Sequence, residues 1–261
     1  MEAGNRCYDQ RVPEETNRKI VDHTSDINMP YSSIAREYLL KEGFPADQII
    51  KTGSPMYEVL DFYSKEIEAS DVLARLNLEA EKYFVVSTHR EENVDEEARL
   101  RKIASILEAI CEKYGYPVIL STHPRTQKRI DSYDIKMHSG VKMMKPLGFL
   151  DYIKLQQNAF CVISDSGTIT EESSIMNFPA LNMRDVHERP EGMEEGVAIM
   201  TGLSQERVLE SIPVAIGMKR GSDRSILLVK DYYAPGVSDK VAKIILSYTD
   251  FIKRRVWGKY E

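Results

Sequence analysis

Cysteine is scarce in this sequence, and the three cysteines that it has lie far apart. Cys7, Cys111 and Cys161 include no closely spaced pair, and no other cluster of metal-ligand residue types is present. Zinc sites and disulfide-stabilised folds are built on such pairs. We therefore expect no disulfide framework, no structural zinc and no metal.

Long apolar runs are absent too. No stretch approaches the roughly 20 apolar residues of a membrane-spanning helix, and the chain does not open with a charged and then apolar signal peptide. Positive charge is not in excess, because 35 lysines and arginines stand against 41 acidic residues, for a formal net charge of -6. Nucleic-acid-binding domains are basic. We therefore expect a cytoplasmic protein with no membrane partner and no nucleic-acid partner.

What the sequence does have is a globular composition, 42% hydrophobic and 29% charged over 261 residues, which is enough for a substantial core. From residue 83 onward, short apolar runs alternate with longer amphipathic stretches. Such alternation indicates a mostly parallel sheet with helical crossovers. Earlier in the chain, short strands are expected at 26–29 and 48–51.

Residues 160–176 carry the strongest functional signal. An apolar run at 160–163 stops abruptly at small polar residues, and residues 168–176 then place apolar side chains near helical spacing. The pattern predicts a strand, a tight turn and a helix. The N–H groups at the start of that helix point at the turn and suit a phosphate, and Gly167 lets a ligand approach the backbone closely.

Glu171 and Glu172 lie about one turn into this helix. Either carboxylate is able to reach a diol bound beside the phosphate, as acidic residues do for ribose in nucleotide-binding folds. Simple complementation of the helix dipole explains the pair equally well. A second strand expected at 180–183 ends in a charged loop at 184–191. Two successive strands that deliver polar loops to one edge of an α/β sheet form a ligand crevice.

The segments SDSGTITEE at 164–172 and MRDVHERPE at 183–191 resemble the nucleotide-sugar half of the non-hydrolysing UDP-N-acetylglucosamine 2-epimerases. Thr168 departs from the family pattern, which usually has a second glycine there. The resemblance implies an α/β fold with Rossmann-like doubly wound parallel sheets of the glycosyltransferase-B type.

The start of the chain resembles the same family. EAGNR at 2–6 and PEETNR at 13–18 resemble motifs that follow an interior strand of the family's first domain. We therefore expect an incomplete first domain that lacks roughly a hundred residues or more, a length of several strand–helix units. The expected domains are a remnant of the N-terminal Rossmann-like domain at 1–70, a UDP-binding Rossmann-like domain at 82–236 and a crossover helix at 237–261.

Two histidine loops follow expected strands. THREEN at 88–93 resembles the family loop whose histidine contacts the diphosphate and takes part in catalysis, which implies these roles for His89 and substrate binding by Arg90. Glu91 stands where the family commonly has a second arginine. His123 in STHPR corresponds to a histidine near the family's domain interface. By position alone, either histidine is also consistent with a surface loop.

The segment at 146–152 resembles the part of the family that holds uracil, and Tyr152 aligns best with the ring that packs on the base. Aromatic residues at such spacing are often plain core anchors. Glu2 and Glu14 match the catalytic glutamates of the family, although Glu14 would also complement the dipole of its own helix. The resemblance implies, as substrate-binding residues, Arg18, Arg90, His123, Tyr152, Ser166, Gly167, Thr168, Glu172 and Arg184.

We therefore interpret the chain as an epimerase that inverts C2 of a UDP-N-acetylhexosamine, with this UDP-sugar as its partner and a homodimer as its assembly. No cofactor is required, because the hydrogen returns as a proton. EAGNRC, DQRVPEETNRKIVDH and STHREEN resemble more closely the branch that makes UDP-N-acetyl-L-fucosamine. A glycosyltransferase of the same fold and a non-catalytic UDP-sugar-binding module are the alternatives. For the chain by itself, we expect UDP binding with little or no exchange of the sugar C2 proton.

Overall fold

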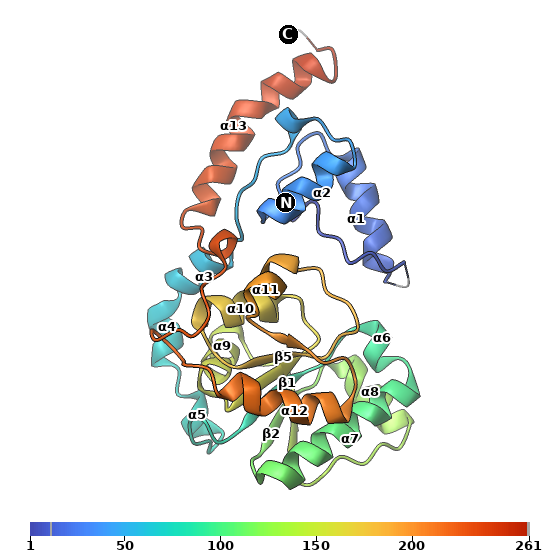
Figure 1. Cartoon of the computed structure of the whole chain (residues 1–261), viewed down its shortest axis with the longest axis vertical. Helices are drawn as coiled ribbons and strands as arrows, with labels where there is room; N and C mark the ends of the chain where they lie inside the picture. Colours follow the sequence, from blue (N-terminus) through green and yellow to red (C-terminus); the bar gives the residue numbers. More distant parts are fainter. Residues whose placement is uncertain (11, 260–261) are drawn as a thin grey trace. The chain divides into compact units, whose positions relative to one another are not determined.

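The computed structural model describes residues 1–10 and 12–259 (Figure 1) and divides into two compact units. The larger unit comprises Tyr63–Asp185 and Gly192–Leu227. The smaller unit comprises Met1–Phe62, Val186–Glu191 and Leu228–Glu261. The domain boundaries expected from the sequence stay a prediction, because contacts within one chain do not test independent folding.

A six-stranded sheet forms the centre of the larger unit. Its strands lie in the order β3-β2-β1-β4-β5-β6, and every neighbouring pair is parallel. This is the order of a doubly wound Rossmann-like sheet, with the switch point between β1 and β4, so the predicted α/β fold class is confirmed. The strands are β1 Phe84–Ser87, β2 Val118–Ser121, β3 Val141–Met144, β4 Cys161–Ser164, β5 Ala180–Asn182 and β6 Ile199–Met200.

Helices cover both faces of this sheet. Successive residues of a strand point to opposite faces, so one strand contributes side chains to both apolar clusters. Phe84 and Val86 belong to the apolar cluster that includes side chains of α7, α8 and α12, whereas Val85 belongs to the cluster that includes side chains of α5, α9 and α10. The helices between residues 63 and 227 are α4 Ser64–Ala69, α5 Val72–Arg75, α6 Glu91–Val94, α7 Glu97–Tyr114, α8 Pro124–Ser132, α9 Phe149–Asn158, α10 Thr168–Met176, α11 Pro190–Glu195 and α12 Gln205–Ile216.

The smaller unit is mainly helical. The prediction of strands at 26–29 and 48–51 is wrong. The two segments form no extended ladder and meet only in an isolated parallel bridge between Asn28 and Ile49. Pro30 has no N–H group with which to continue the pairing. The elements of this unit are α1 Pro13–Thr24, α2 Ser33–Lys41, the 3-10 turn η1 Ala46–Gln48, α3 Met56–Phe62, the 3-10 turn η2 Lys230–Tyr232 and α13 Val237–Arg255.

Candidate functional site

A pocket of about 240 Å³ lies in the larger unit where β1 and β4 end. This is the switch point of the sheet, at which doubly wound folds bind their ligands. Five of the residues predicted to bind or act on a ligand line it, together with six others, three of which belong to the segment at 146–152 predicted to hold uracil. The lining residues are Ser87, His89, Ser121, Pro146, Leu147, Phe149, Tyr152, Ser164, Ser166, Thr168 and Glu172.

The turn between β4 and α10 joins a strand to the N-terminus of a helix, as predicted, and phosphate binding there stays a prediction. Thr168 N donates to Ser166 Oγ at 3.3 Å, and the hydroxyl oxygens of the two residues are 2.9 Å apart. Gly167 has φ -66° and ψ -32°, a conformation open to any residue. Glycine at this position therefore supplies no special backbone geometry, and its contribution is the absence of a side chain over the first turn of α10.

Glu172 combines burial with access to the pocket. It is 8% exposed and lines the pocket, and Gln156 Nε2 donates to Glu172 Oε2 at 2.7 Å. Burial raises the pKa of Glu172 above its ordinary value, and hydrogen bonds from Gln156 and Thr168 offset part of that effect. Glu171 is also buried but is not among the lining residues. Of the two acids, Glu172 is thus the one placed to accept a hydrogen bond from a ligand hydroxyl.

Tyr152 projects from α9 into the same pocket and is half-buried. Burial raises the pKa of Tyr152, and interactions with Ser87 and Gln156 offset part of that rise. An aromatic ring that lines a pocket is able to pack on a flat ligand group.

His89 lines the pocket as well, and its loop is held by Asp165, the residue after β4. The carboxylate of Asp165 is fully buried. It accepts the backbone N–H groups of His89 and Arg90 at 3.1 Å each, and Thr88 Oγ1 and Asn93 Nδ2 at 3.0 Å each. Sequence reasoning missed this residue; the signal that marks it is a carboxylate placed directly after a buried apolar strand.

Arg184, which follows β5, is also buried, at 2% exposure. Its Nη2 lies 3.7 Å from Oε1 of Glu92 in α6. Arg184, Arg90 and Gly167 are not among the residues that line the pocket. Their contacts with a ligand stay predictions.

His123 lies on the surface and begins α8, where its Nδ1 accepts the backbone N–H of Arg125 at 3.2 Å. This is the geometry expected for the surface-loop alternative. Glu91, the residue that departs from the family pattern, accepts Arg125 Nη1 at 2.7 Å. The arginine of the second histidine loop therefore neutralises the unusual acid of the first loop.

The predicted acid–base motifs lie in the smaller unit, and two of their residues form ion pairs there. Arg189 Nη2 donates to Glu2 Oε1 at 2.7 Å, and Arg18 Nη2 lies 3.4 Å from Glu188 Oε1. Glu14 is half-buried in the first turn of α1, one turn before Arg18. The charged loop after β5 thus contacts both motifs.

Two further buried carboxyl groups of this unit escaped sequence analysis. Glu15 accepts the backbone N–H of Cys7 at 2.9 Å; burial alone would raise its pKa, but hydrogen bonds from Cys7 and the charge of Lys19 hold the pKa below its ordinary value. Glu191 accepts the hydroxyl of Tyr232 at 2.9 Å, and burial raises the pKa of Glu191. Acidic residues near a helix start are normally exposed, so spacing gave no sign of their burial.

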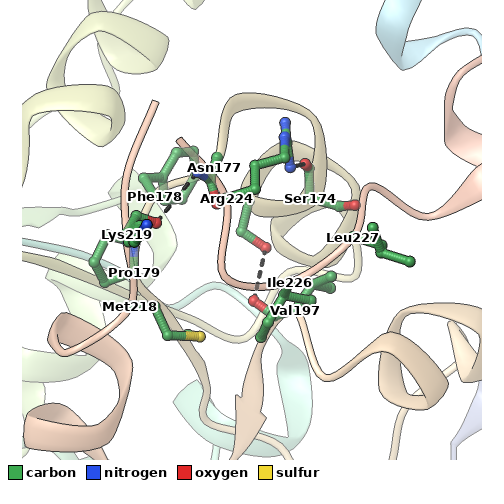
Figure 2. Close-up of a pocket in the computed structure, with 11 residues that line it drawn as sticks. Ser174, Asn177, Phe178, Pro179, Val197, Met218, Lys219, Arg224, Ile226 and Leu227 are labelled. Atoms are coloured by element: carbon green, nitrogen blue, oxygen red, sulfur yellow. Dashed lines mark hydrogen bonds between the residues drawn. The ribbon is translucent and has the colours of Figure 1, made fainter. Parts of the chain in front are cut away.

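The C-terminal end of α10 is anchored by a loop at 218–226 (Figure 2). Asn177, at φ 54°, ends the helix, and its Nδ2 donates to three carbonyl oxygens of this loop. Arg224 donates to the carbonyl oxygens of Ser174 and Ile175, where a cation also complements the helix dipole. The cavity between these groups is only about 20 Å³, about the size of a water site. The region therefore holds the helix rather than a ligand.

Within residues 1–10 and 12–259, no three or more histidine, cysteine, aspartate or glutamate side chains are grouped so that they could hold a metal ion. No helix in these same ranges is both long and apolar enough to cross a membrane. Cys7, Cys111 and Cys161 are free thiols.

Comparison with known proteins identifies several relatives. The family model described as UDP-N-acetylglucosamine 2-epimerase matches residues 1–246. A UDP-N-acetylglucosamine 2-epimerase of Methanocaldococcus jannaschii is 34% identical over 227 residues, which make up 84% of this chain and 62% of that protein. The present chain thus spans less than two thirds of the length of this curated relative.

Two solved structures are similar throughout this chain. The UDP-N-acetylglucosamine 2-epimerase from Rickettsia bellii has 47% sequence identity and a TM-score of 0.91, covering 99% of this chain and 69% of that one. The Methanocaldococcus jannaschii UDP-GlcNAc 2-epimerase in complex with UDP-GlcNAc and UDP has 30% identity and a TM-score of 0.86, covering 95% of this chain and 68% of that one.

Proposed function

This chain belongs to the UDP-N-acetylglucosamine 2-epimerase family, and from that premise we propose that it binds a UDP-sugar and serves the inversion of C2 in a UDP-N-acetylhexosamine. The observation that carries the proposal is the switch-point pocket, which gathers Tyr152, Glu172 and the turn at 166–168. The relative solved with UDP-GlcNAc and UDP supports this choice of ligand.

We assign a part of the ligand to each wall of the pocket. The turn at 166–168 and His89 hold the diphosphate, as helix N-termini do for phosphate groups. Glu172 accepts a hydrogen bond from a ribose hydroxyl, and the ring of Tyr152 packs on uracil beside residues 146–147. Further positive charge for the diphosphate comes, in this proposal, from Arg90 and Arg184. Arg18 and His123 complete the set of proposed substrate-binding residues.

The chemistry that we propose for Glu2 and Glu14 is a pair of proton transfers. One carboxylate takes the C2 proton, the electrons of the C2–H bond form a C1–C2 double bond, and the C1–O bond breaks with its electron pair leaving on UDP. UDP then adds back to C1 while the other carboxyl group delivers a proton to the opposite face of C2. Since no electrons are gained or lost overall, the step needs no nicotinamide.

We also propose that the protein is a homodimer of the cytoplasm. Free thiols at Cys7, Cys111 and Cys161 suit a reducing compartment. Sedimentation equilibrium of the full chain would then give twice the 29.9 kDa chain mass, and a species at the single-chain mass would contradict the dimer.

The nucleotide site is tested by titration calorimetry of the full chain with UDP and with its 2′- and 3′-deoxy analogues. We expect wild type to bind UDP more tightly than at least one deoxy analogue. Glu172→Gln should weaken UDP binding on the order of 10-fold and abolish that preference, because a charged acceptor is lost. Glu171→Gln is the matched control, a buried neighbour outside the lining, and should bind as wild type does. Equal UDP affinity in wild type and Glu172→Gln would refute the ribose assignment.

The reaction is tested by incubating the full chain with UDP-N-acetylglucosamine in heavy water and following deuterium at C2 by NMR. Exchange that disappears in Glu14→Gln supports the epimerase. UDP release that requires an added sugar acceptor would instead identify a glycosyltransferase. UDP binding with neither outcome, the result that we expect for this chain by itself, would show that the chain alone acts only as a nucleotide-sugar-binding module.

A further inference from the structure

Asp165 stands between the lining residues Ser164 and Ser166 and is a buried ionisable group that the proposed chemistry does not use. We propose that Asp165 is a positioning residue that accepts the Nδ1–H of His89, so that the neutral imidazole carries its proton on Nδ1 and presents Nε2 toward the pocket. Only the ligand contact of the ring rests on the proposed function. Because the oxygens of a diphosphate are acceptors, Nε2 can hold the diphosphate of a UDP-sugar only when it takes up a second proton, with Asp165 still accepting Nδ1–H.

The position of Asp165 is fixed by the sheet itself. Asp165 N donates to Ser87 O at 3.2 Å, which extends the pairing of β1 and β4 beyond their last residues. The hydroxyl oxygens of Ser87 and Ser164, one at the end of each strand, are 2.7 Å apart. A carboxylate attached at this point has little freedom to move relative to β1, from which the His89 loop departs.

The loop in turn is fixed by the carboxylate. Its two oxygens receive two consecutive backbone N–H groups, from His89 and Arg90, as well as the side chains of Thr88 and Asn93. The first two contacts set the backbone direction at His89, and the last two close the loop on both sides of it. Removing these acceptors would leave several buried donors without partners, which proteins avoid.

The orientation of the imidazole follows from the same carboxylate. His89 Nδ1 lies 3.2 Å from Asp165 Oδ1. An ionised carboxylate only accepts hydrogen bonds, so an Nδ1 lone pair at this distance would face another acceptor. The contact is favourable only if Nδ1 carries a proton, which leaves Nε2 as the bare nitrogen of the neutral ring. A partner on one ring nitrogen commonly sets the role of the other in this way.

The arrangement also reaches the end of the next strand. Asn93 Oδ1 accepts Arg99 Nη2 at 3.0 Å, and Arg99 Nη2 donates to Asp185 Oδ2 at 2.9 Å. Asp185 therefore belongs to the same hydrogen-bond network, but these hydrogen bonds connect it to neither His89 nor Asp165 directly. It supplies a matched control that removes one negative charge without removing the acceptor of Nδ1–H.

The test is nitrogen-15 NMR of the histidine rings in the full chain, measured about two units above the ordinary histidine pKa of ~6.5, where a neutral ring predominates. The sequence has five histidines, and a His89→Gln sample assigns the signal. We expect an Nδ1–H pattern for His89 in wild type and in Asp185→Asn. In Asp165→Asn we expect a mixture of tautomers, because the amide can offer a donor or an acceptor to the ring.

A wild-type spectrum with the proton of His89 on Nε2 would overturn the proposal, as would an unchanged Nδ1–H pattern in Asp165→Asn. If Asp165→Asn does not fold, the wild-type spectrum still decides the matter. Adding UDP separates this inference from the function on which it rests. A shift of the His89 Nε2 signal on adding UDP supports both the positioning role of Asp165 and the diphosphate contact. An Nδ1–H pattern that does not change when UDP is added would support the positioning role and contradict the diphosphate contact.

Discussion

The two units of the chain are stabilised in different ways. The larger unit buries both faces of a parallel sheet in two extensive apolar clusters. The smaller unit has an apolar cluster with only three buried members, Ala3, Leu39 and Ile49. A parallel sheet covered by helices on both faces buries much apolar surface. Among the described residues of the smaller unit, strand pairing is reduced to one bridge, and the apolar cluster is correspondingly small.

Buried charged groups add to the small apolar cluster of the smaller unit. The side chain of Arg6 is fully buried, with Nη1 2.8 Å from Asp22 Oδ2 and Nη2 2.7 Å from Glu42 Oε2. Such a pair is costly to break, because one lost partner leaves a buried charge. Apolar side chains meanwhile stay on the surface of this unit, with Ile20 at 57% and Leu246 at 81% exposure. Buried ion pairs thus contribute to holding the smaller unit together, whereas exposed apolar side chains are found in both units, as with Leu227 of the larger unit at 74% exposure.

The largest effect that follows from this contrast concerns amide hydrogen exchange of the full chain. We expect the amides of β1 and β4 to exchange at least about 100-fold more slowly than those of Asn28 and Ile50, because local opening is easiest where few apolar contacts must be broken. Exchange read by NMR or by mass spectrometry of peptides measures this directly. Equal protection of the two sets would show that the small apolar cluster is as cooperative as the sheet.

The second effect tests whether the smaller unit is closely packed despite its small core. Gly4 has φ +78°, and a Cβ there would lie 2.3 Å from Ala35 O. We expect Gly4→Ala to destabilise the smaller unit by about 3 kcal/mol, through backbone strain and a clash with main chain. Gly43→Ala is the control, since Gly43 has φ +92° but nothing within 4 Å of the added carbon, and it should cost about 1 kcal/mol.

Thermal unfolding and exchange of the α2 amides measure both variants, with UDP binding to the larger unit as the check that damage is local. If Gly4→Ala lowers the unfolding temperature no more than Gly43→Ala does, the backbone around Ala35 can move to make room for the added carbon. Close packing would then not be what stabilises the smaller unit.

The same contrast explains how much the sequence could predict. The βα alternation after residue 83 predicted a mostly parallel α/β sheet, and the family resemblance added the glycosyltransferase-B type. The helix α10 has the predicted bounds, and α13 begins where the crossover helix was expected and ends at Arg255. Such strands are buried by their own helices, so local pattern and tertiary structure agree. In the smaller unit the apolar runs at 26–29 and 48–51 looked like strands, but a strand needs partners that no local pattern reveals.

Site residues divide along a similar line. His89, Tyr152 and Glu172, which motifs singled out, line one pocket near the ends of β1 and β4, and their roles stay predictions. Asp165 and Glu15 were missed, because their importance lies in partners distant in sequence, such as the Asn93 amide 72 positions from Asp165. Spacing along a chain shows which helix face a residue occupies, but not which loop folds back on it.

The third effect compares two buried carboxyl groups, one in each unit, whose pKa values move in opposite directions. The pKa of Glu15 is lowered, so the folded state binds fewer protons than the unfolded state. The stability that Glu15 contributes is therefore present above the ordinary glutamate pKa of ~4.3. It is lost as the pH falls through the lowered pKa. Glu15→Gln should cost about 2 kcal/mol at pH 7, because hydrogen bonds to a charged group are lost.

The cost of Glu15→Gln should shrink below about pH 4, where the ordinary glutamate would also be protonated. Thermal unfolding from pH 3 to pH 7 measures it, with Glu37→Gln, an exposed acid on α2, as the control for charge alone. A cost independent of pH would mean that the shape of the side chain, and not its charge, stabilises the smaller unit.

The smallest effect has the opposite sign and belongs to the larger unit. Burial raises the pKa of Glu172, so the folded state binds more protons than the unfolded state between about pH 4.3 and the raised pKa, and stability falls as pH rises through that window. Glu172→Gln removes the buried charge while keeping an acceptor for Gln156. It should therefore stabilise the ligand-free larger unit by about 1 kcal/mol at pH 7 and by nothing at pH 3.

The matched control is Glu206→Gln, an exposed acid on α12, which should leave the unfolding temperature unchanged. A destabilised Glu172→Gln at neutral pH would show that the carboxylate is well solvated by its partners before any ligand arrives. If Glu172→Gln is more stable but binds UDP more weakly, the carboxylate of Glu172 lowers the stability of the larger unit in return for nucleotide binding. The reason would be that this carboxylate, which suits a ribose hydroxyl, is buried without a hydroxyl partner when no ligand is bound.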